Sequence, residues 1–269
     1  MDITVGIITW NARPLLEQLV RSVYTSVKDV AFEVVVVDNG SQDGTREMVR
    51  KVFPSVVLVE NPKNLGVAPA RNQLLRKARG RYILSLDVDT TLFPNGAVET
   101  IVSTMDHHPE AAIGGPRLVY KDGSLQLSCR PFPSPMNILV EGTFLRKYFP
   151  SSRFVKGYTL EDWDHGTLRE VDWMYGAALA IRASVLEKIG LFDEAFFYLY
   201  EDVDFCFRAR AAGFKVLYIP SAVICHHLER EDRPVFSKTL GTHLRSIRRY
   251  LLRDYLLMLK LKAVRQWPM

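Results

Sequence analysis

The first 115 residues alternate between short apolar runs and stretches whose apolar residues recur at helical spacing. The runs, rich in β-branched residues, are residues 3–9, 32–37, 55–60 and 82–86. Continuous runs of this kind are typical of parallel strands buried on both faces. The stretches expected to be helices are residues 14–27, 44–52 and 67–78. This alternation predicts an α/β fold built on a doubly wound, Rossmann-like, mostly parallel sheet with right-handed crossovers.

The second half of the chain is less regular. Residues 116–172 are rich in proline, glycine, serine and aromatic residues, and we expect them to form loops over one face of the sheet. Regular structure returns as a strand and short helix over 174–190, a helix over 203–212 and a strand over 215–219. The pattern indicates one domain over residues 1–240, with halves at 1–115 and 116–240 and a mixed sheet in the second half.

Composition places the chain among ordinary globular proteins, since 48% of the residues are apolar and 24% are charged. No uncharged apolar run reaches the roughly 18 residues that a membrane span needs. The first ten residues lack a basic stretch ahead of their apolar run, so we expect no secretory signal. The three cysteines match no zinc spacing, and we expect reduced thiols in a cytoplasmic protein.

The net charge of +5 lies in the C-terminal tail. Residues 241–269 hold seven basic residues and one acidic residue, so the first 240 residues are nearly neutral. A nucleic-acid-binding domain needs a basic face. We therefore expect no nucleic-acid partner.

The tail has the pattern of an amphipathic helix. One stripe of the expected helix contains Leu244, Ile247, Leu251, Tyr255 and Met258. The basic residues opposite are Arg245, Arg249, Arg253 and Lys260, although Lys262 falls within the apolar stripe. This pattern indicates peripheral contact with an anionic membrane. The alternative is a terminal helix packed on the body of the protein.

Polar residues follow three of the expected strands: residues 9–11, 38–41 and 87–89. Ligands of open α/β sheets bind at this edge. A dinucleotide site and a P-loop are disfavoured, because neither a Gly-x-Gly-x-x-Gly motif nor a lysine-bearing phosphate loop follows the first strand. Asp87 and Asp89 could share a divalent cation with a phosphate, or simply cap a turn. Asp38 taken alone is better explained as an Asx-turn residue.

Six motifs in fixed order carry a family resemblance. They are IITWN (7–11), VVVVDNGSQDGT (34–45), NLGVAPARN (64–72), DVD (87–89), MYGAALAIRASVLEKIGLFDEAFF (174–197) and YEDVDFCFRARAAGFKV (200–216). This order resembles glycosyltransferase family 2, and within that family the bacterial rhamnosyltransferase-like branch.

The resemblance implies a GT-A fold and an inverting enzyme that uses Mn²⁺ or Mg²⁺. The donor would be a UDP- or dTDP-linked sugar, bound by residues 1–115. The acceptor would be a saccharide or a lipid-linked saccharide in glycan biosynthesis, bound by residues 116–240. Lipid-linked acceptors favour a place on the cytoplasmic face of the membrane.

The resemblance also implies roles on the donor side. Thr9 and Asn11 would line the nucleotide pocket, and Asp38 would accept a hydrogen bond from the pyrimidine base. Arg71 would reach the base or the phosphates, with a solvated helix residue as the alternative. Asp87 would face the ribose.

The implied metal ligands are Asp89 and His226, and His227 is the competing candidate. On the acceptor side, Gly176 would let the backbone pass close to the sugar or acceptor, unless it only forms a bulge. A site with carboxylate and imidazole ligands, together with diphosphate oxygens, would suit Mn²⁺ or Mg²⁺.

The implied general base is Asp202 in the Glu201-Asp202 pair, with Glu201 beside the acceptor. Asp204 lies further into the expected helix and should point away, and helix capping is the alternative role for all three. Two rival functions stay open: a nucleotidyltransferase, which should carry a glycine-rich basic loop after the first strand, and an inactive sugar-nucleotide-binding protein.

Overall fold

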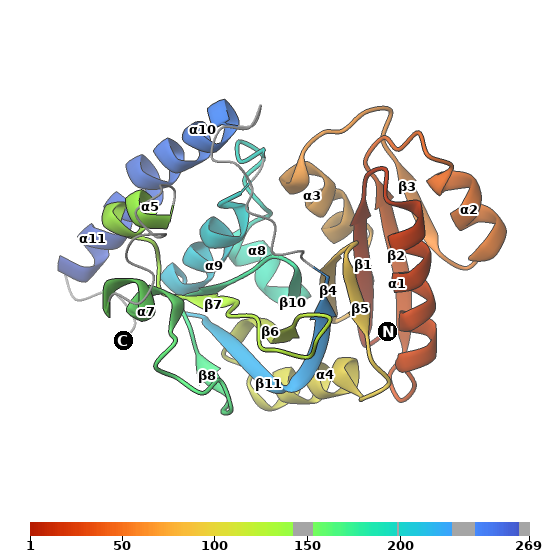
Figure 1. Cartoon of the computed structure of the whole chain (residues 1–269), viewed down its shortest axis with the longest axis horizontal. Helices are drawn as coiled ribbons and strands as arrows, with labels where there is room; N and C mark the ends of the chain where they lie inside the picture. The colour runs from red at the N-terminus through yellow and green to blue at the C-terminus, as the bar shows by residue number, and fades with distance from the viewer. Residues whose placement is uncertain (142–152, 198, 228–239, 264–269) are drawn as a thin grey trace.

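A computed structural model describes residues 1–141, 153–197, 199–227 and 240–263. Within them, one large sheet has the strand order β3-β2-β1-β4-β10-β6-β11-β5, with β8 paired to β11 (Figure 1). Strands β3, β2, β1 and β4 are parallel, whereas β10 runs antiparallel to both β4 and β6. The expected α/β fold with a mostly parallel first half and a mixed second half is confirmed.

The strands of this sheet are β1 (Ile3–Thr9), β2 (Phe32–Asp38), β3 (Val57–Glu60), β4 (Tyr82–Asp87), β5 (Thr90–Leu92), β6 (Ala111–Val119), β8 (Arg169–Glu170), β10 (Ala178–Arg182) and β11 (Lys215–His226). A separate pair consists of β7 (Cys129–Arg130) and β9 (Trp173–Met174). The helices are α1 (Arg13–Ser26), α2 (Thr45–Val52), α3 (Val67–Lys77), α4 (Ala97–His107), α5 (Pro135–Glu141), α7 (Arg153–Thr159), α8 (Leu186–Ile189), α9 (Glu201–Ala211), α10 (Leu240–Tyr250) and α11 (Leu256–Ala263). A 3₁₀ turn, η1 (Ala183–Val185), precedes α8, and a π-helical turn, η2 (Leu251–Tyr255), joins α10 to α11.

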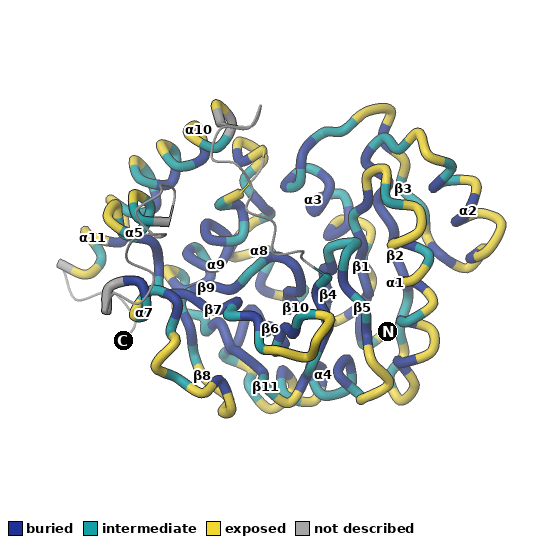
Figure 2. The backbone as a smooth tube through the Cα atoms, in the orientation of Figure 1, coloured by how far each residue is buried: buried dark blue, intermediate teal, exposed yellow. Residues whose placement is uncertain are grey.

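Side chains along each strand alternate between the two faces of the sheet. In β2, Val34 and Val36 pack into one apolar cluster with α1, α2 and α4, while Val35 and Val37 pack into a second with α3, α8 and α9. This is the two-residue period of a strand covered on both faces. Figure 2 shows the result: the central strands are buried, whereas exposed residues lie on the outer helices, on the loops and on β3 and β8. The two layers hold the strand ends in fixed positions.

The sequence predicted most of the first half and less of the second. The four apolar runs correspond to β1 to β4, and the three expected helices correspond to α1 to α3. The pattern missed β5, α4 and β6, and the strand expected over 215–219 continues to His226. Residues 116–172 are not only loops, because the described part of this range contains the end of β6, all of β7 and β8, and helices α5 and α7.

The expected C-terminal helix is present over residues 240–263, but its faces differ from the expected ones. The buried residues are Ser246, Tyr250, Asp254 and Met258. Leu244, from the expected apolar stripe, is 55% exposed. Arg249 and Arg253, from the expected outer face, instead form ion pairs with Asp193. This helix therefore packs on the body, while residues 264–269 lie outside the described residues.

The three cysteines are free thiols, and all are buried: Cys129, Cys206 and Cys225. Among the described residues, no helix combines the length and apolarity required to cross a bilayer.

Candidate active site

The carboxyl ends of β1, β2 and β4 bring several of the expected site residues to one edge of the sheet. Thr9 is the register partner of Asp38, and Ile8 is the partner of Asp87. The polar loops that follow these strands therefore lie side by side, as the parallel arrangement requires.

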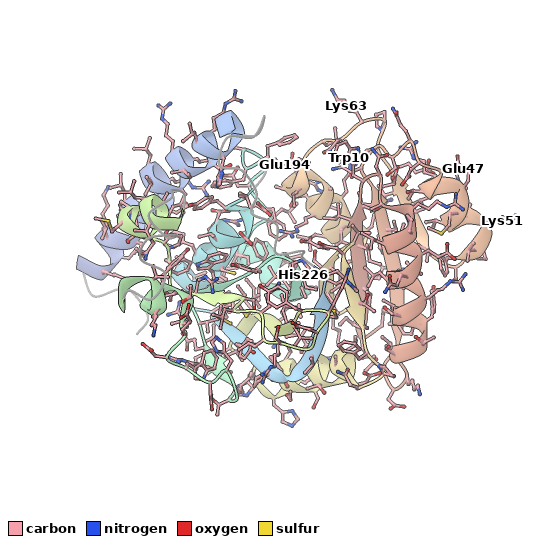
Figure 3. All side chains as sticks on the ribbon, in the orientation of Figure 1. Trp10, Glu47, Lys51, Lys63, Glu194 and His226 are labelled. Carbon is pink, nitrogen blue, oxygen red and sulfur yellow. The ribbon has the colours of Figure 1, made fainter. Side chains whose placement is uncertain are left out.

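Asp87, Asp89 and His226 form a three-residue cluster whose ligand atoms lie within 4.8 Å of one another. His226 Nε2 is 3.4 Å from Asp89 Oδ1. Backbone pairing creates the cluster: β5 begins directly after Asp89, and Thr90 is the register partner of His226 at the end of β11. Figure 3 shows His226 near the middle of the molecule, between the two halves of the sheet.

His226 has a fixed orientation, and its neighbour faces another group. Gln126 Oε1 lies 2.7 Å from His226 Nδ1. When Nδ1 donates to this oxygen, Nε2 presents its lone pair toward Asp89, which is the tautomer that a metal ligand requires. His227 Nε2 instead lies 2.6 Å from Thr91 Oγ1. Of the two histidines, the structure brings only His226 into the cluster.

The donor set of the cluster fits a hard divalent cation. Partial desolvation raises the pKa of Asp87, and the negative charge of Asp89 adds to this, whereas Arg71 opposes it. Desolvation also acts on Asp89, but the hydrogen bond and charge of His226 outweigh it, so the pKa of Asp89 is lowered. Two carboxylates at this separation repel each other, and a bound cation would relieve that repulsion. Oxygen donors with one imidazole suit Mn²⁺ or Mg²⁺.

Arg71 connects this cluster to the start of α9. Its guanidinium donates to Asp87 Oδ1 at 3.1 Å, to Glu201 Oε1 at 2.9 Å and to the Gly176 carbonyl at 2.8 Å. Arg71 is only 2% exposed. The alternative of a solvated helix residue is therefore wrong. In this structure Arg71 organises carboxylates, and a contact with base or phosphate stays a prediction.

A side chain at position 176 would collide with the guanidinium of Arg71. A Cβ at this position would lie 2.5 Å from Nη2 and 2.6 Å from Nη1 of Arg71. The glycine thus permits a close approach, and the group that approaches is a protein side chain. A close approach to sugar or acceptor remains a prediction.

Asp202 faces the same backbone segment. Its Oδ2 accepts a hydrogen bond from the Gly176 N–H at 2.9 Å, and its Oδ1 accepts one from the Val203 N–H at 2.8 Å. Asp204 is fully buried and pairs with Arg208 and Arg253 instead, so it points away from Asp202 as expected. Asp202 is the more accessible member of the Glu201-Asp202 pair.

Burial and mutual repulsion perturb the two adjacent carboxyl groups. Desolvation and the charge of Asp202 raise the pKa of Glu201 to about 7, against the opposing effect of Arg71. Desolvation also raises the pKa of Asp202, and Arg71 again opposes the shift. A perturbed pair of carboxyl groups beside a candidate metal cluster is typical of acid–base catalysis.

The nucleotide-side residues are arranged differently from the expectation. Asp38 has no exposed surface; it accepts from Arg46 Nε at 2.5 Å and, at 3.2 Å, from the Ser41 N–H. Asp38 thus bonds its own loop, but through the N–H three residues on and not the one two residues on that defines an Asx turn. A contact with a base stays a prediction. Thr9 is also buried, whereas Asn11 is exposed and accepts from the Gln42 N–H at 2.8 Å. Asn11 therefore ties the loop after β1 to the loop after β2.

Sequence reasoning missed Arg46 and Gln126 as parts of the site. Arg46 forms an ion pair with Asp38. It directly follows the VVVVDNGSQDGT motif (34–45), so the family resemblance did not include it. Gln126 lies in a range that appeared to be loop. Trp10 directly follows β1 and is 54% exposed (Figure 3), and the sequence pattern indicated no role for it.

Two solved structures share the fold of this chain. The structure of GalNAc-T7 with UDP, GalNAc and Mn²⁺ matches with a TM-score of 0.65 at 17% identity, covering 92% of this chain and 48% of that one. The mannosyltransferase PcManGT from Pyrobaculum calidifontis, in complex with GDP-Man and Mn²⁺, matches with a TM-score of 0.58 at 21% identity, covering 86% and 58%. The chain thus spans about half the length of these structures, and at such identities the likeness shows the fold. The fold is that of the GT-A glycosyltransferases.

Sequence comparison gives the family. The model of glycosyl transferase family 2 matches residues 4–162, and that of glycosyl transferase family group 2 matches residues 146–266. A relative, N-acetylglucosaminyl-diphospho-decaprenol L-rhamnosyltransferase of Mycobacterium tuberculosis, is 28% identical over 234 residues, which are 82% of this chain and 74% of the relative. The chain belongs to glycosyl transferase family 2.

Proposed function

We propose that this chain is an inverting, divalent-metal-dependent glycosyltransferase of glycan biosynthesis. It would move a sugar from a UDP- or dTDP-linked donor to a hydroxyl group of a saccharide or lipid-linked acceptor. The observation that carries the proposal is the placement of the Asp87, Asp89 and His226 cluster next to the Glu201-Asp202 pair, with Arg71 in contact with both.

The metal-binding cluster and the Glu201-Asp202 pair would have different roles in the reaction. Asp87, Asp89 and His226 would hold Mn²⁺ or Mg²⁺, which would offset the negative charge on the departing diphosphate. Asp202 would accept the proton of the acceptor hydroxyl as its oxygen bonds to the anomeric carbon and the bond to the diphosphate breaks. Arg71 and the Gly176 N–H would hold the Glu201-Asp202 pair in place. Attack from the face opposite the diphosphate inverts the anomeric centre.

The relative from Mycobacterium tuberculosis supports a finer proposal for the substrates. Its name specifies L-rhamnose and a diphospho-decaprenol-linked acceptor. We infer that a dTDP-linked deoxyhexose and an acceptor linked to a lipid diphosphate are the first substrates to test. The rival nucleotidyltransferase is disfavoured, because residues 7–14 lack the glycine-rich basic loop that such an enzyme needs.

The test is a panel of UDP- and dTDP-sugars, assayed for hydrolysis and transfer with Mn²⁺, with Mg²⁺ or with excess chelator. We expect turnover with at least one donor, loss of turnover on chelation, and recovery when metal is restored. His226→Ala should abolish turnover, while the matched control His227→Ala should retain most of it. Turnover that persists undiminished in chelator would disprove the metal requirement. Binding of a donor without hydrolysis or transfer would favour the inactive binding protein.

A second proposal concerns the exposed side of the C-terminal helix. Leu252, Leu256 and Leu259 are 60%, 46% and 44% exposed, and the exposed Lys260 and Lys262 lie on the same segment. Exposed leucines with neighbouring cations fit the surface of an anionic membrane. This arrangement supports peripheral membrane contact, at the cytoplasmic face, although by a different face from the one that the sequence pattern indicated.

Sedimentation with vesicles tests the membrane contact. The full chain should bind vesicles that contain phosphatidylglycerol, and added salt should weaken the binding. The double variant Leu252→Glu/Leu256→Glu should not bind, whereas Leu15→Glu on α1 should bind normally. If the full chain stays in the supernatant at low salt, the proposal is wrong.

A further inference from the structure

The described C-terminal segment (residues 240–263, formed by α10, η2 and α11) packs beside α9 and α5 (Figure 1). Its buried positions, Ser246, Tyr250, Asp254 and Met258, recur every four residues. Tyr250 donates a hydrogen bond to the Pro133 carbonyl at 2.9 Å. This hydrogen bond and the burial of Tyr250 and Met258 make the segment part of the folded body.

Arg253 lies at the centre of the contact between this segment and the body. Its guanidinium pairs with Asp193, with Asp204 and with its neighbour Asp254, the last at 2.6 Å from Nε. The guanidinium also lies over the ring of Phe196, with Cζ 5.6 Å from the centroid. One arginine thus joins three carboxylates, two of which belong to the body.

The two body carboxylates flank the entry to α9. Asp193 lies in the loop that leads to this helix, and Asp204 occupies its first turn, where its N–H donates to the Tyr200 carbonyl at 2.9 Å. Asp204 has no exposed surface, and its other cation is Arg208, 2.8 Å away. Arg253 therefore contacts both ends of the short segment that carries Glu201 and Asp202.

This segment has a costly backbone conformation. Leu199 and Tyr200 have φ angles of 64° and 71°, in the left-handed region that side chains other than glycine disfavour. Such a conformation persists when surrounding contacts hold it. The Tyr200 ring packs against the Tyr250 ring at 5.3 Å between centroids, so the C-terminal segment supplies one of these contacts directly.

The first turn of α9 is thus held on two sides. On one side, Glu201 pairs with Arg71, and Asp202 accepts from the Gly176 N–H. On the other side, Asp204 pairs with Arg253. Because these residues share one helical turn, a displacement of Asp204 moves Asp202 as well.

We propose that Arg253 is a positioning residue for the general base: by clamping Asp193 and Asp204, it holds the first turn of α9 so that Asp202 faces the reaction site. The inference rests on the proposed function, since it takes Asp202 as the base. It also makes residues 240–263 part of the catalytic domain, so the segment is not a separable tail.

The test uses full-length variants. Arg253→Met should lower kcat for transfer by about 10- to 100-fold, the order expected when a catalytic group is misplaced by about 1 Å, while KM for the donor changes less than about twofold. Arg253→Lys should recover part of kcat because it keeps a charge. Arg21→Met is the matched control: Arg21 pairs with Glu17 and lies 5.5 Å over the Phe53 ring, far from α9 in the fold, and its removal should leave kcat unchanged.

Hydrogen–deuterium exchange gives a readout that needs no substrate. Arg253→Met should increase amide exchange in peptides covering residues 199–207 relative to the wild type and to Arg21→Met. If the Met variant does not fold, Arg253→Lys and Asp204→Asn serve the same comparison, each with a smaller effect.

The outcomes separate the two proposals. Unchanged exchange over 199–207, or an unchanged kcat per folded molecule at a temperature well below the melting point, overturns the positioning role. A wild-type chain without turnover on any donor counts against the proposed function, while the exchange comparison still decides whether Arg253 holds the first turn of α9.

Discussion

At the scale of single residues, two adjacent carboxyl groups have different environments. Glu201 is buried against Arg71, whereas Asp202 is more accessible and is fixed by the Gly176 N–H. A general base must reach the acceptor hydroxyl, and accessibility favours Asp202 for this role.

Asp202→Asn keeps the shape of the side chain and removes its basicity. We expect transfer to fall by roughly 10² to 10⁴, the usual contribution of a general base, with donor affinity almost unchanged. Transfer rates and nucleotide titrations measure the two quantities. Asp204→Asn, which alters a carboxylate on the other side of the same turn, is expected to lower transfer less. Normal transfer by Asp202→Asn together with loss in Glu201→Gln would move the role to Glu201.

Arg71 is a buried cation whose three contacts need a planar fork of donors. Arg71→Met would leave Asp87 and Glu201 without their cation, and breaking a buried pair in this way costs about 3–5 kcal/mol of the free energy of unfolding. Arg71→Lys keeps the charge but cannot reproduce all three contacts. Urea unfolding should rank the stabilities as wild type, then Lys, then Met. Equal unfolding midpoints would show that Arg71 does not hold these carboxylates together.

At the scale of elements, the sequence predicted the elements whose pattern is local. The runs behind β1 to β4 are continuous and β-branched because both faces of those strands are buried. By contrast, β5 has three residues and β7 has two, too short for any periodicity to appear. Their places depend on pairing with residues far along the chain, as in the register of Thr90 with His226.

The faces of the C-terminal helix were predicted wrongly because apolar side chains do not mark its buried side. Leu244 is 55% exposed, whereas Ser246 and Asp254 are buried. Asp254 pairs with Arg253, and no apolar pattern can reveal that contact. The candidate site shows the same limit. The motifs predicted the residues proposed to bind substrate or metal, but not Arg46, Gln126 and Arg253, which contact Asp38, His226 and Asp204.

Asp254 makes the stability of this segment depend on pH. Burial and the charge of Asp204 raise the pKa of Asp254 to about 6, against the opposing effect of Arg253. The folded-state pKa lies above the unfolded value of 3.8, so the protonated Asp254 side chain stabilises the folded state. Its contribution to the free energy of unfolding is fully present below pH 3.8 and is lost as pH rises through 6.

Asp254→Asn should therefore be more stable than the wild type at pH 7, by on the order of 2 kcal/mol, and the difference should disappear near pH 4. Thermal unfolding over this pH range is the measurement. A wild-type advantage at pH 7 would contradict the expectation, because it would mean that the ionised carboxylate is stabilising.

At the scale of the whole molecule, the candidate metal cluster spans both halves of the chain. Asp87 and Asp89 follow β4, whereas His226 ends β11, on the far side of β10 and β6 in the sheet order. Residues 1–115 and 116–240 thus share one sheet, and the first half alone lacks one of the three candidate metal ligands.

Metal binding should consequently stabilise the fold as a whole. With Mn²⁺ at 100 times its dissociation constant, the gain is about 2.7 kcal/mol, because the ion binds the folded chain and not the unfolded one. Differential scanning fluorimetry should show a higher melting temperature with Mn²⁺ for the wild type and for His227→Ala. Asp89→Asn should show little or no increase. An equal increase in Asp89→Asn would place the ion elsewhere.

The rate at which the buried cysteines are alkylated measures local unfolding of the site. Cys206 lies in α9, and Cys225 directly precedes His226, so each belongs to one part of the site. Burial raises the pKa of both thiols, and only a thiolate that reaches solvent reacts with an alkylating reagent. The ratio of each labelling rate to that of an unstructured thiol therefore gives the equilibrium constant for opening around that cysteine. Mass spectrometry should show slow labelling of both cysteines, and labelling of Cys225 should be slower still with Mn²⁺. Rapid labelling of Cys206 in the native protein would show that α9 opens readily.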